Sequence, residues 1–274
     1  MIPVCFCGNR KIFNGLAMSV LSLAANCSES LHVYVLSMNL CEVNPDFVCF
    51  TERQIEILNG VLKEYNPESR AELADVTQLY KKYLLNGKNQ NSGYTPYTLL
   101  RLLLDEMPDM PDKLVYLDVD TVCTGDVKQL YDTDISAYEF AAALDYMGKF
   151  WISRDYCNAG VMLINLANVK KTRLFAACRE EVVNRKMIMP DQTALNRLAN
   201  AKLILPRRFN EQRERCEDTV VKHFCKGIRY LPFFHIYNVK QWQRDKVRKV
   251  LKIKWMEELY SECDRLLSSL GAQS

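Results

Sequence analysis

The sequence lacks an uninterrupted apolar run of about 18 residues, the length that crosses a membrane. Its first residues also lack the long apolar core of a secretory signal peptide. No internal repeat and no low-complexity linker interrupts its 274 residues. We therefore expect a globular chain without a membrane span, long enough to bury a large core as one domain or as one domain with an appendage.

No C-x-x-C pair occurs among the 11 cysteines, and their number is odd. Several of them, including Cys5, Cys7 and Cys123, lie in apolar runs that resemble strands. This pattern indicates small buried hydrophobic residues in a reducing compartment, not disulfides or zinc ligands. Together with the missing signal peptide core, it predicts a cytoplasmic protein.

The net charge of the chain is small, but positive charge is concentrated near its end. The formal net charge of +3 is too small to imply nucleic-acid binding, and we expect no nucleic-acid partner. Residues 238–255 contain seven Lys or Arg and two Trp against one acid. A basic helix in 240–255 would suit peripheral contact with an anionic membrane. The alternative is a solvated terminal helix packed on the body through Val247, Val250 and Leu251.

Apolar strand-like runs alternate with helical patterns along the chain, which is typical of an α/β fold with a parallel sheet. The sequence TERQ at 51–54 has the capping-box pattern and predicts a helix to about residue 65. Strands are predicted at 2–7, 31–37, 71–76, 113–122, 140–145, 157–165, 202–206 and 228–236. Helices are predicted at 14–26, 96–107 and 166–186, and from 189 onward.

The stretch KLVYLDVDTV at 113–122 predicts a buried central strand that carries Asp118 and Asp120. Alternate residues of a strand share a face, so both carboxylates would point the same way. Ligands bind at the carboxyl ends of strands in open α/β sheets, and paired carboxylates suit Mg²⁺ or Mn²⁺. The alternative is that one acid caps the next turn and the other is merely exposed.

Three further residues are candidates for the same site. Arg101 lies in an apolar helical run, where a buried guanidinium needs an anionic partner, either a structural acid or an acid of the site. Asn158 begins a strand beside Gly160, which allows close backbone approach. Asp191 follows Pro190 at a helix start, where a capping role is the alternative.

Two enzyme classes place two acids in this spacing after an apolar strand. In haloacid-dehalogenase-type phosphatases the first Asp is a nucleophile, and in glycosyltransferases of the GT-A fold the acids hold a metal. The phosphatase motif sits on the first strand of its domain, whereas about 110 residues precede Asp118 here. No late acidic pair completes a phosphatase metal site, so the transferase interpretation is favoured.

Several stretches together resemble glycosyltransferase family 8, the retaining family that includes glycogenin and bacterial lipopolysaccharide galactosyl- and glucosyltransferases. The stretches run from residue 2 to about 242 and read IPVCFCGN, YTLLRLLL, KLVYLDVDTVCTGDVKQLYDTD, AALD, CNAGVMLINL, PDQTALN and FHIYNVKQW. The resemblance implies a GT-A fold with a mixed, mostly parallel sheet flanked by helices. It implies a catalytic domain at 1–238 and a basic helical tail at 239–274.

The resemblance also implies a divalent metal, Mn²⁺ or Mg²⁺, held by Asp118 and Asp120. The family's third ligand is a histidine near the C-terminal end, and His235 fits that motif best although its spacing to Lys240 is one residue short. His223 is the rival. Lys240 matches the lysine that contacts the donor diphosphate.

Other matching positions imply a binding site for the nucleotide sugar. Arg101 and Val119 belong to the donor site. The uridine falls on Cys7, Gly8 and Asn9, although the family often has acids after its first strand, where this chain has Asn9 and Arg10. The polar residues around the transferred sugar are Asp145, Asn158, Asp191 and Gln192.

The implied reaction is retaining transfer of galactose or glucose from a UDP-sugar to a saccharide or glycolipid acceptor, in lipopolysaccharide or polysaccharide synthesis. Gln192 would support front-face attack by the acceptor. The basic tail would place the protein at the inner face of the membrane, and residues 86–93 would form a lid over the donor. The alternatives are the phosphatase and a non-catalytic nucleotide-sugar binder.

Overall fold

The computed structural model describes residues 1–90, 95–229 and 235–271. A seven-stranded sheet lies at its centre, with strand order β3-β2-β1-β4-β7-β6-β8. The strands are β1 (Ile2–Cys7), β2 (Leu31–Ser37), β3 (Arg70–Asp75), β4 (Lys113–Leu117), β6 (Phe140–Leu144), β7 (Cys157–Asn165) and β8 (Lys202–Leu205).

The sheet is mixed and mostly parallel, as the sequence predicts. Strand β1 runs parallel to β2 and β4, β2 to β3, and β6 to β8. Strand β7 is the exception, because it pairs antiparallel with both of its neighbours, β4 and β6. The chain adds β2 and β3 on one side of β1 and then β4 on its other side. In open α/β sheets ligands bind at such a switch point, which here lies between β1 and β4.

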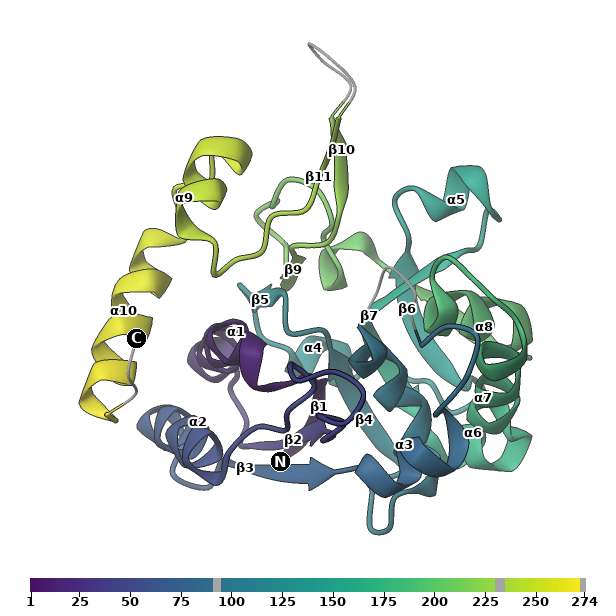
Figure 1. The fold of residues 1–274 in the computed structure, drawn as a ribbon. Coiled ribbons are helices and arrows are strands. Elements are labelled where there is room, and N and C mark those ends of the chain that lie inside the picture. Colours follow the sequence, from purple (N-terminus) through teal and green to yellow (C-terminus); the bar gives the residue numbers. More distant parts are fainter. Residues whose placement is uncertain (91–94, 230–234, 272–274) are drawn as a thin grey trace.

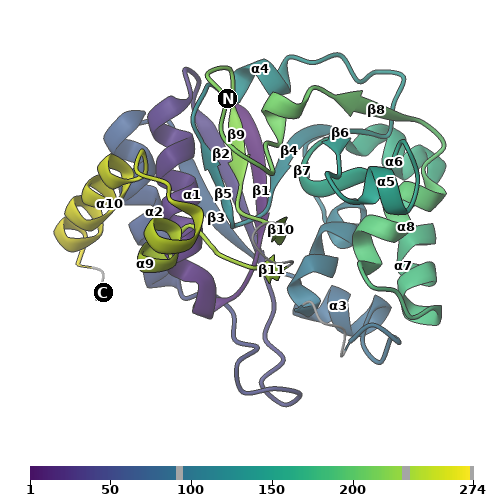
Figure 2. The ribbon, with the colours of Figure 1, turned by 90° about the horizontal axis from the view of Figure 1, so that it is seen from above.

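Helices cover both faces of the sheet (Figures 1 and 2). One face carries α1 (Phe13–Asn26) and α2 (Glu52–Tyr65), with α10 (Glu257–Ser269) packed on these two helices. The other face carries α3 (Thr77–Tyr83), the 3₁₀ helix η2 (Pro96–Glu106), α6 (Leu166–Thr172), α7 (Leu174–Asn184) and α8 (Pro190–Leu198). Shorter helical segments are η1 (Arg10–Ile12), α4 (Lys128–Tyr131), α5 (Gly148–Trp151), η3 (Arg207–Phe209), α9 (Arg244–Lys246) and the π-helical η4 (Val247–Leu251).

The two hydrophobic cores follow from the two-residue period of the strands. In β1, Val4 and Phe6 pack into the core under α1 and α2, while Cys5 and Cys7 point into the core of the opposite face. Cys5, Cys7 and Cys123 are buried, as their apolar surroundings in the sequence predict, whereas Cys41 and Cys216 are exposed.

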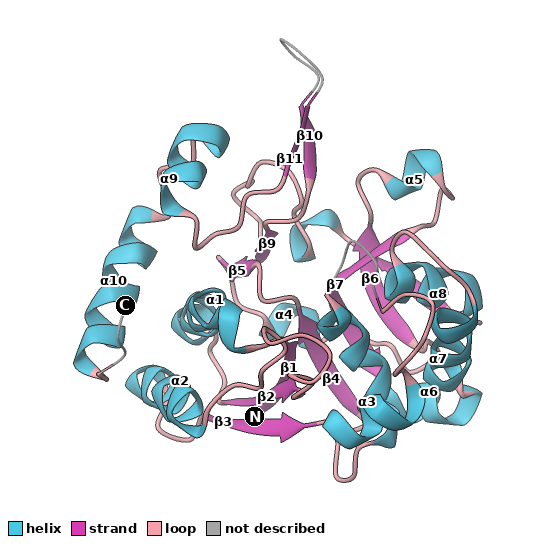
Figure 3. Ribbon diagram, viewed as in Figure 1, coloured by secondary structure: helices cyan, strands magenta, loops and turns pink. Residues whose placement is uncertain are grey.

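Two small sheets lie beside the main one (Figure 3). Strand β5 (Thr121–Cys123) pairs antiparallel with β9 (Val221–His223), and β10 (Gly227–Arg229) pairs antiparallel with β11 (His235–Tyr237). Sequence analysis predicted one strand at 228–236, but the chain forms this hairpin instead. The predicted strand at 113–122 is also two strands, β4 and β5, with a turn between them.

Two predicted helices are interrupted. The helix at 166–186 breaks into α6 and α7 at Arg173, whose φ of 60° is left-handed. The basic segment 240–255 forms only α9 and η4 and then ends its helix at Lys252, with a φ of 57°. Residues 91–93 of the predicted lid lie outside the described residues, and Asn89 in its first part packs against the end of α7. No helix among the described residues has both the length and the apolar character to cross a membrane.

Candidate active site

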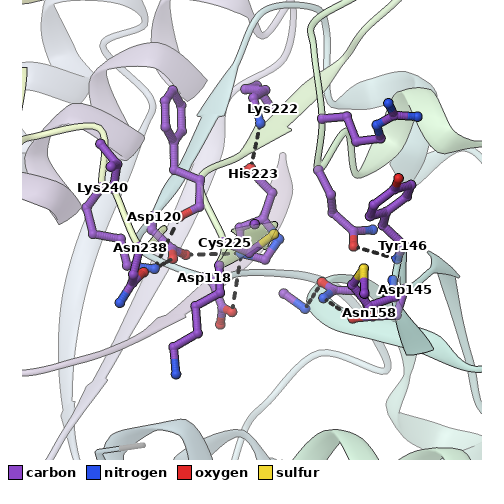
Figure 4. A pocket seen from close by; sticks show the side chains of 18 of the residues that line it. Asp118, Asp120, Asp145, Tyr146, Asn158, Lys222, His223, Cys225, Asn238 and Lys240 are labelled. Carbon is purple, nitrogen blue, oxygen red and sulfur yellow. Dashed lines mark hydrogen bonds and ion pairs between the residues drawn. The ribbon is translucent and has the colours of Figure 1, made fainter. Parts of the chain in front are cut away.

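An open cleft lies at the carboxyl edge of the sheet. Its lining includes residues at or just after the ends of three strands, namely Cys7 from β1, Asp118 after β4 and Asp145 after β6. Figure 4 shows polar side chains that converge in it from several segments. Its volume of about 1910 Å³ exceeds the roughly 300–1,000 Å³ of pockets for drug-sized ligands. A cleft of this size has room for two substrates side by side.

The two acids of the central motif meet through a turn, which differs from the extended strand that the sequence predicts. Strand β4 ends at Leu117, and the N–H of Thr121 donates to the carbonyl of Asp118 at 3.2 Å. The hydroxyl of Ser19 on α1 donates to the carbonyls of Val119 at 2.8 Å and Thr121 at 2.7 Å. These backbone bonds hold the turn, so the carboxylates remain available to the cleft.

His223 joins Asp118 and Asp120 in a group of side chains that could hold a metal ion. The β5–β9 register places His223 opposite Thr121, and the N–H of the next residue, Phe224, donates to the carbonyl of Asp120 at 2.8 Å. His223 Nε2 therefore lies 3.2 Å from Asp120 Oδ1 and 3.9 Å from Asp118 Oδ2. Potential ligand atoms of Asp118, Asp120 and His223 lie within 4.8 Å of one another.

This arrangement favours His223, the rival of His235, as the third ligand. His235 begins β11 in a separate hairpin, whereas β9 is paired directly with the strand that follows the two acids. The side chain of His235 lies outside the part of the chain that the structure describes. The strand pairing, which no local motif revealed, selects His223.

Lys240 and His223 both reach Asp120. Lys240 Nζ forms an ion pair with Asp120 Oδ2 and donates to the carbonyl of Phe224 at 3.2 Å. Burial alone would raise the pKa of Asp120, but Lys240 and His223 hold that pKa well below its usual value. Burial alone would lower the pKa of Lys240, but Asp120 raises it above its usual value. Asp120 is therefore a carboxylate and Lys240 an ammonium ion at neutral pH.

Arg101 connects the group of Asp118, Asp120 and His223 to the opposite wall of the cleft. It is 2% exposed, and its guanidinium lies 2.8 Å from Asp118 Oδ1 and 3.2 Å from Asp191 Oδ2. It also donates to the carbonyls of Ala159 and Thr98. Burial raises the pKa of Asp191, against the opposing charge of Arg101. The predicted anionic partner of Arg101 is thus an acid of the site.

The four residues that the resemblance assigns to the sugar lie together and are all buried. Asp145 Oδ2 accepts hydrogen bonds from Asn158 Nδ2 at 2.9 Å and from Gln192 Nε2 at 3.1 Å. The oxygen of the Gln192 amide accepts from the N–H of Ala159 at 3.0 Å. Asp191 precedes Gln192 in α8 and completes this wall. Helix α8 and the ends of β6 and β7 therefore present a rigid polar surface to the cleft.

The positions expected at the uridine are only partly in the cleft. Cys7 belongs to its lining, as does Val119 of the expected donor site, whereas Gly8 and Asn9, which follow β1, do not. The amide of Asn9 donates to the carbonyl of Asp46 at 3.1 Å. The predicted contact of Asn9 with the base stays a prediction.

Three supporting residues escaped sequence reasoning, because only the fold shows what they contact. Ser19 and Gln241 both donate to the carbonyl of Val119, from opposite ends of the chain. Asn210 contacts His223 Nδ1 at 3.1 Å. In the sequence Asn210 is a single polar residue after Phe209, and such residues are too common to single out one.

Known proteins resemble this chain in sequence and in fold. A model of the family described as "Glycosyl transferase family 8" matches residues 3–245. The chain belongs to glycosyltransferase family 8. Membership in this family excludes the phosphatase interpretation of the acidic motif, because the match spans the motif together with the cleft residues on both of its sides.

Curated proteins from bacteria are similar in sequence. A lipopolysaccharide 1,3-galactosyltransferase of Salmonella typhimurium is 28% identical over 74% of this chain and 61% of its own length. A lipopolysaccharide 1,2-glucosyltransferase of Escherichia coli is 26% identical over 90% of this chain and 80% of its own. The glycosyltransferase GlyA of Streptococcus pneumoniae is 37% identical over 32% of this chain, which spans 13% of GlyA. The chain thus covers less than two thirds of two of these relatives.

Solved structures show the same fold. The galactosyltransferase LgtC, in complex with donor and acceptor sugar analogues, superposes with a TM-score of 0.65 at 19% identity, over 100% of this chain and 98% of LgtC. The glycosyltransferase GlyE of Streptococcus pneumoniae gives a TM-score of 0.60 at 18% identity, over 95% of this chain and 63% of GlyE. The LgtC-like GT-A fold predicted from the sequence is therefore confirmed.

Proposed function

We propose that this protein is a metal-dependent retaining hexosyltransferase that moves galactose or glucose from a UDP-sugar to a saccharide acceptor. The observation that carries the proposal is the grouping of Asp118, Asp120 and His223 within 4.8 Å at the edge of a large cleft. Lys240 lies on one side of this group, and the Asp145–Gln192 wall lies on the other. A diphosphate and a sugar need these two kinds of surface, adjacent to each other.

The donor set fits a divalent cation. Two carboxylates and one imidazole suit Mn²⁺ well, and the carboxylates also suit Mg²⁺. The metal would be held by Asp118, Asp120 and His223, and when bound it would neutralise negative charge that develops on the departing diphosphate. Arg101 supports this set, because its bond to Asp118 Oδ1 leaves Oδ2 on the side of His223.

The chain's own residues have distinct roles in the proposed reaction. Lys240 remains charged at neutral pH and would bind a phosphate oxygen of the leaving group, as an oriented cation in a partly buried site. Asp145 and Asp191 would accept hydrogen bonds from sugar hydroxyls. Gln192, which is held at both ends of its amide, would stabilise positive charge at the anomeric carbon during front-face attack by the acceptor.

The donor and the acceptor follow from relatives, not from geometry. The similar proteins named above carry galactosyl- and glucosyltransferase names and act on lipopolysaccharide by those names. By analogy, we propose a glycolipid or cell-surface glycan acceptor, a cytoplasmic location, and peripheral membrane contact through residues 240–255. The exposed lysines of that segment support the last proposal.

The test is release of UDP from a panel of UDP-sugars with Mn²⁺ and without acceptor, since many transferases slowly hydrolyse their donors. We expect release from UDP-galactose or UDP-glucose, abolished by EDTA and reduced at least about 100-fold in Asp120→Asn. Asp132→Asn, which changes an exposed acid on the surface after α4, is the matched control and should keep full activity. UDP binding without release, also in the presence of saccharide acceptors, would indicate a non-catalytic binder and refute the proposal.

A further inference from the structure

A buried row of side chains connects His223 to the sugar-binding wall. Asn210 contacts His223 Nδ1 at 3.1 Å, and its amide nitrogen donates to Asn158 Oδ1 at 2.9 Å. Asn158 in turn donates to Asp145 Oδ2 at 2.9 Å. Asn210 has 0% of its surface exposed, so it cannot exchange these partners for bulk water. Figure 4 shows His223 at one end of this row, and Asn158 and Asp145 at the other, on neighbouring walls of the cleft.

The direction of the hydrogen bonds is set at the Asp145 end. Asp145 Oδ1 accepts from the backbone N–H groups of Met147 at 3.0 Å and Gly148 at 2.6 Å. Because a carboxylate only accepts, Asn158 must turn its NH₂ group toward Asp145. Its oxygen then accepts from the backbone N–H of Gly160 at 3.0 Å, which can only donate. Two groups of known polarity therefore fix the orientation of Asn158.

This polarity passes along the row to the histidine. Since Asn158 presents its oxygen, Asn210 must present its NH₂ group to Asn158 and its own oxygen to His223. An amide oxygen only accepts, so Nδ1 of His223 must carry the proton. Nε2 faces Asp120 Oδ1 at 3.2 Å, and because a carboxylate oxygen only accepts, this contact needs either a second proton on Nε2 or a cation between the two atoms. A flipped ring would place carbon atoms at both of these contacts, so the ring orientation is also set.

We propose that Asn210 is a positioning residue that holds the proton of His223 on Nδ1 and so presents the lone pair of Nε2 to a divalent cation. The proposal deepens the proposed function and rests on it for the identity of the site. Partners of this kind behind a metal-binding histidine commonly change metal affinity about 10–100-fold. The same row reaches Asp145, to which Gln192 also donates, so the geometry of the metal site and that of the sugar wall are coupled.

The protonated nitrogen can be measured directly by long-range ¹H–¹⁵N correlation spectra of histidine side chains. The chain has only three histidines, His32, His223 and His235, so single His→Gln variants assign them. Spectra are taken with saturating Mg²⁺. We expect a proton on Nδ1 of His223. His32 is an internal contrast, because Arg70 donates to its Nδ1 at 3.1 Å and the proton should lie on Nε2.

Variants of Asn210 separate positioning from general packing. Asn210→Leu removes the acceptor, and we expect the proton of His223 to leave Nδ1 and the Kd for Mn²⁺, measured by electron paramagnetic resonance, to rise about 10–100-fold. Asn210→Asp keeps an acceptor toward His223 and should retain the Nδ1 proton. Asn89→Leu is the matched control, because Asn89 is also buried and bonded to backbone groups, but at the end of α7.

The outcomes distinguish this inference from the proposed function. A wild-type protein with the proton on Nε2 of His223 refutes the inference, even if Mn²⁺-dependent UDP release is observed. An Asn210→Leu variant that binds Mn²⁺ as tightly as wild type also refutes it. Conversely, an Nδ1 proton that shifts in Asn210→Leu but not in Asn89→Leu supports the positioning role, even in a protein that releases no UDP.

Discussion

Gly160 is the residue that lets β7 pass directly beneath the proposed metal ligands. A Cβ atom at this position would lie 2.2 Å from His223 Cε1 and 2.9 Å from Asp118 Oδ2. Both atoms belong to side chains that are held elsewhere, His223 by Asn210 and Asp118 by Arg101 and Tyr116. The space beside Gly160 is therefore too small for a methyl group.

We expect Gly160→Ala to raise the Kd for Mn²⁺ at least about 10-fold, because one of the two ligands must move. Titration of free Mn²⁺ by electron paramagnetic resonance measures this. Gly125→Ala is the control, since the nearest atom to its new Cβ would lie 3.3 Å away and outside the cluster. Equal Mn²⁺ affinities of Gly160→Ala and wild type would contradict the placement of His223 and Asp118 around Gly160.

Arg101 is the buried counter-ion of two acids, the buried Asp191 and the half-buried Asp118. Asp118, Tyr116 and Asp191 raise its pKa, against the lowering effect of burial, so it is charged in the folded protein. Arg101→Met should lower the free energy of unfolding by about 3–5 kcal/mol, because breaking a buried ion pair leaves uncompensated charge. Urea denaturation measures the loss. Arg265→Met, on the exposed face of α10, should leave the unfolding midpoint nearly unchanged.

At the residue scale, sequence reasoning found groups with chemistry of their own and missed those that act through others. Arg101 was identified because a charge in apolar surroundings is unusual, and Asp118 and Asp120 because they end a buried strand two residues apart. The preference for His235 over His223 relied on local spacing, whereas strand pairing, which brings His223 to the acids, is not visible in local spacing. Asn210 has ordinary chemistry, and only its position in the fold gives it a role.

At the element scale, the predictions were most accurate where local rules act alone. The capping box of α2 forms as its four-residue pattern predicts, with Thr51 accepting from the N–H of Gln54 and Gln54 accepting from that of Thr51. Breaks such as Arg173 and the turn after Leu117 were missed. In both cases tertiary packing overrides a continuous apolar pattern, which carries no signal for a left-handed residue or a turn.

Thr51→Ala should lower the free energy of unfolding by about 1 kcal/mol, because the first turn of α2 loses an acceptor for its free N–H groups. Thr95→Ala is the control. Thr95 also precedes a helix, η2, but its side chain makes no capping hydrogen bond. Chemical denaturation of both variants measures the difference between them, and equal losses would show that the cap of α2 contributes nothing specific.

At the scale of the whole molecule, the end of the chain is part of the folded body. Val247, Met256, Tyr260 and Leu266 are buried in the core that α1 and α2 share. The hydroxyl of Tyr260 donates to the carbonyl of Gln241, which itself holds the turn at Val119. The structure thus combines the two interpretations of the tail, because its apolar side chains pack while Lys246, Lys249, Lys252 and Lys254 are exposed.

These four lysines give the proposed membrane contact a direct test. Lys252 and Lys254 belong to the cleft lining, so contact through them would bring the cleft to the lipid surface, where a glycolipid acceptor lies. We expect the protein to sediment with vesicles containing about 30% phosphatidylglycerol but not with pure phosphatidylcholine, and to be released at about 0.5 M salt. Changing all four lysines to Gln should weaken binding at least about 10-fold. Changing exposed Lys63, Lys170, Lys171 and Lys186 to Gln alters the net charge equally, so an equal loss in this variant would mean that net charge, and not this surface, attracts the membrane.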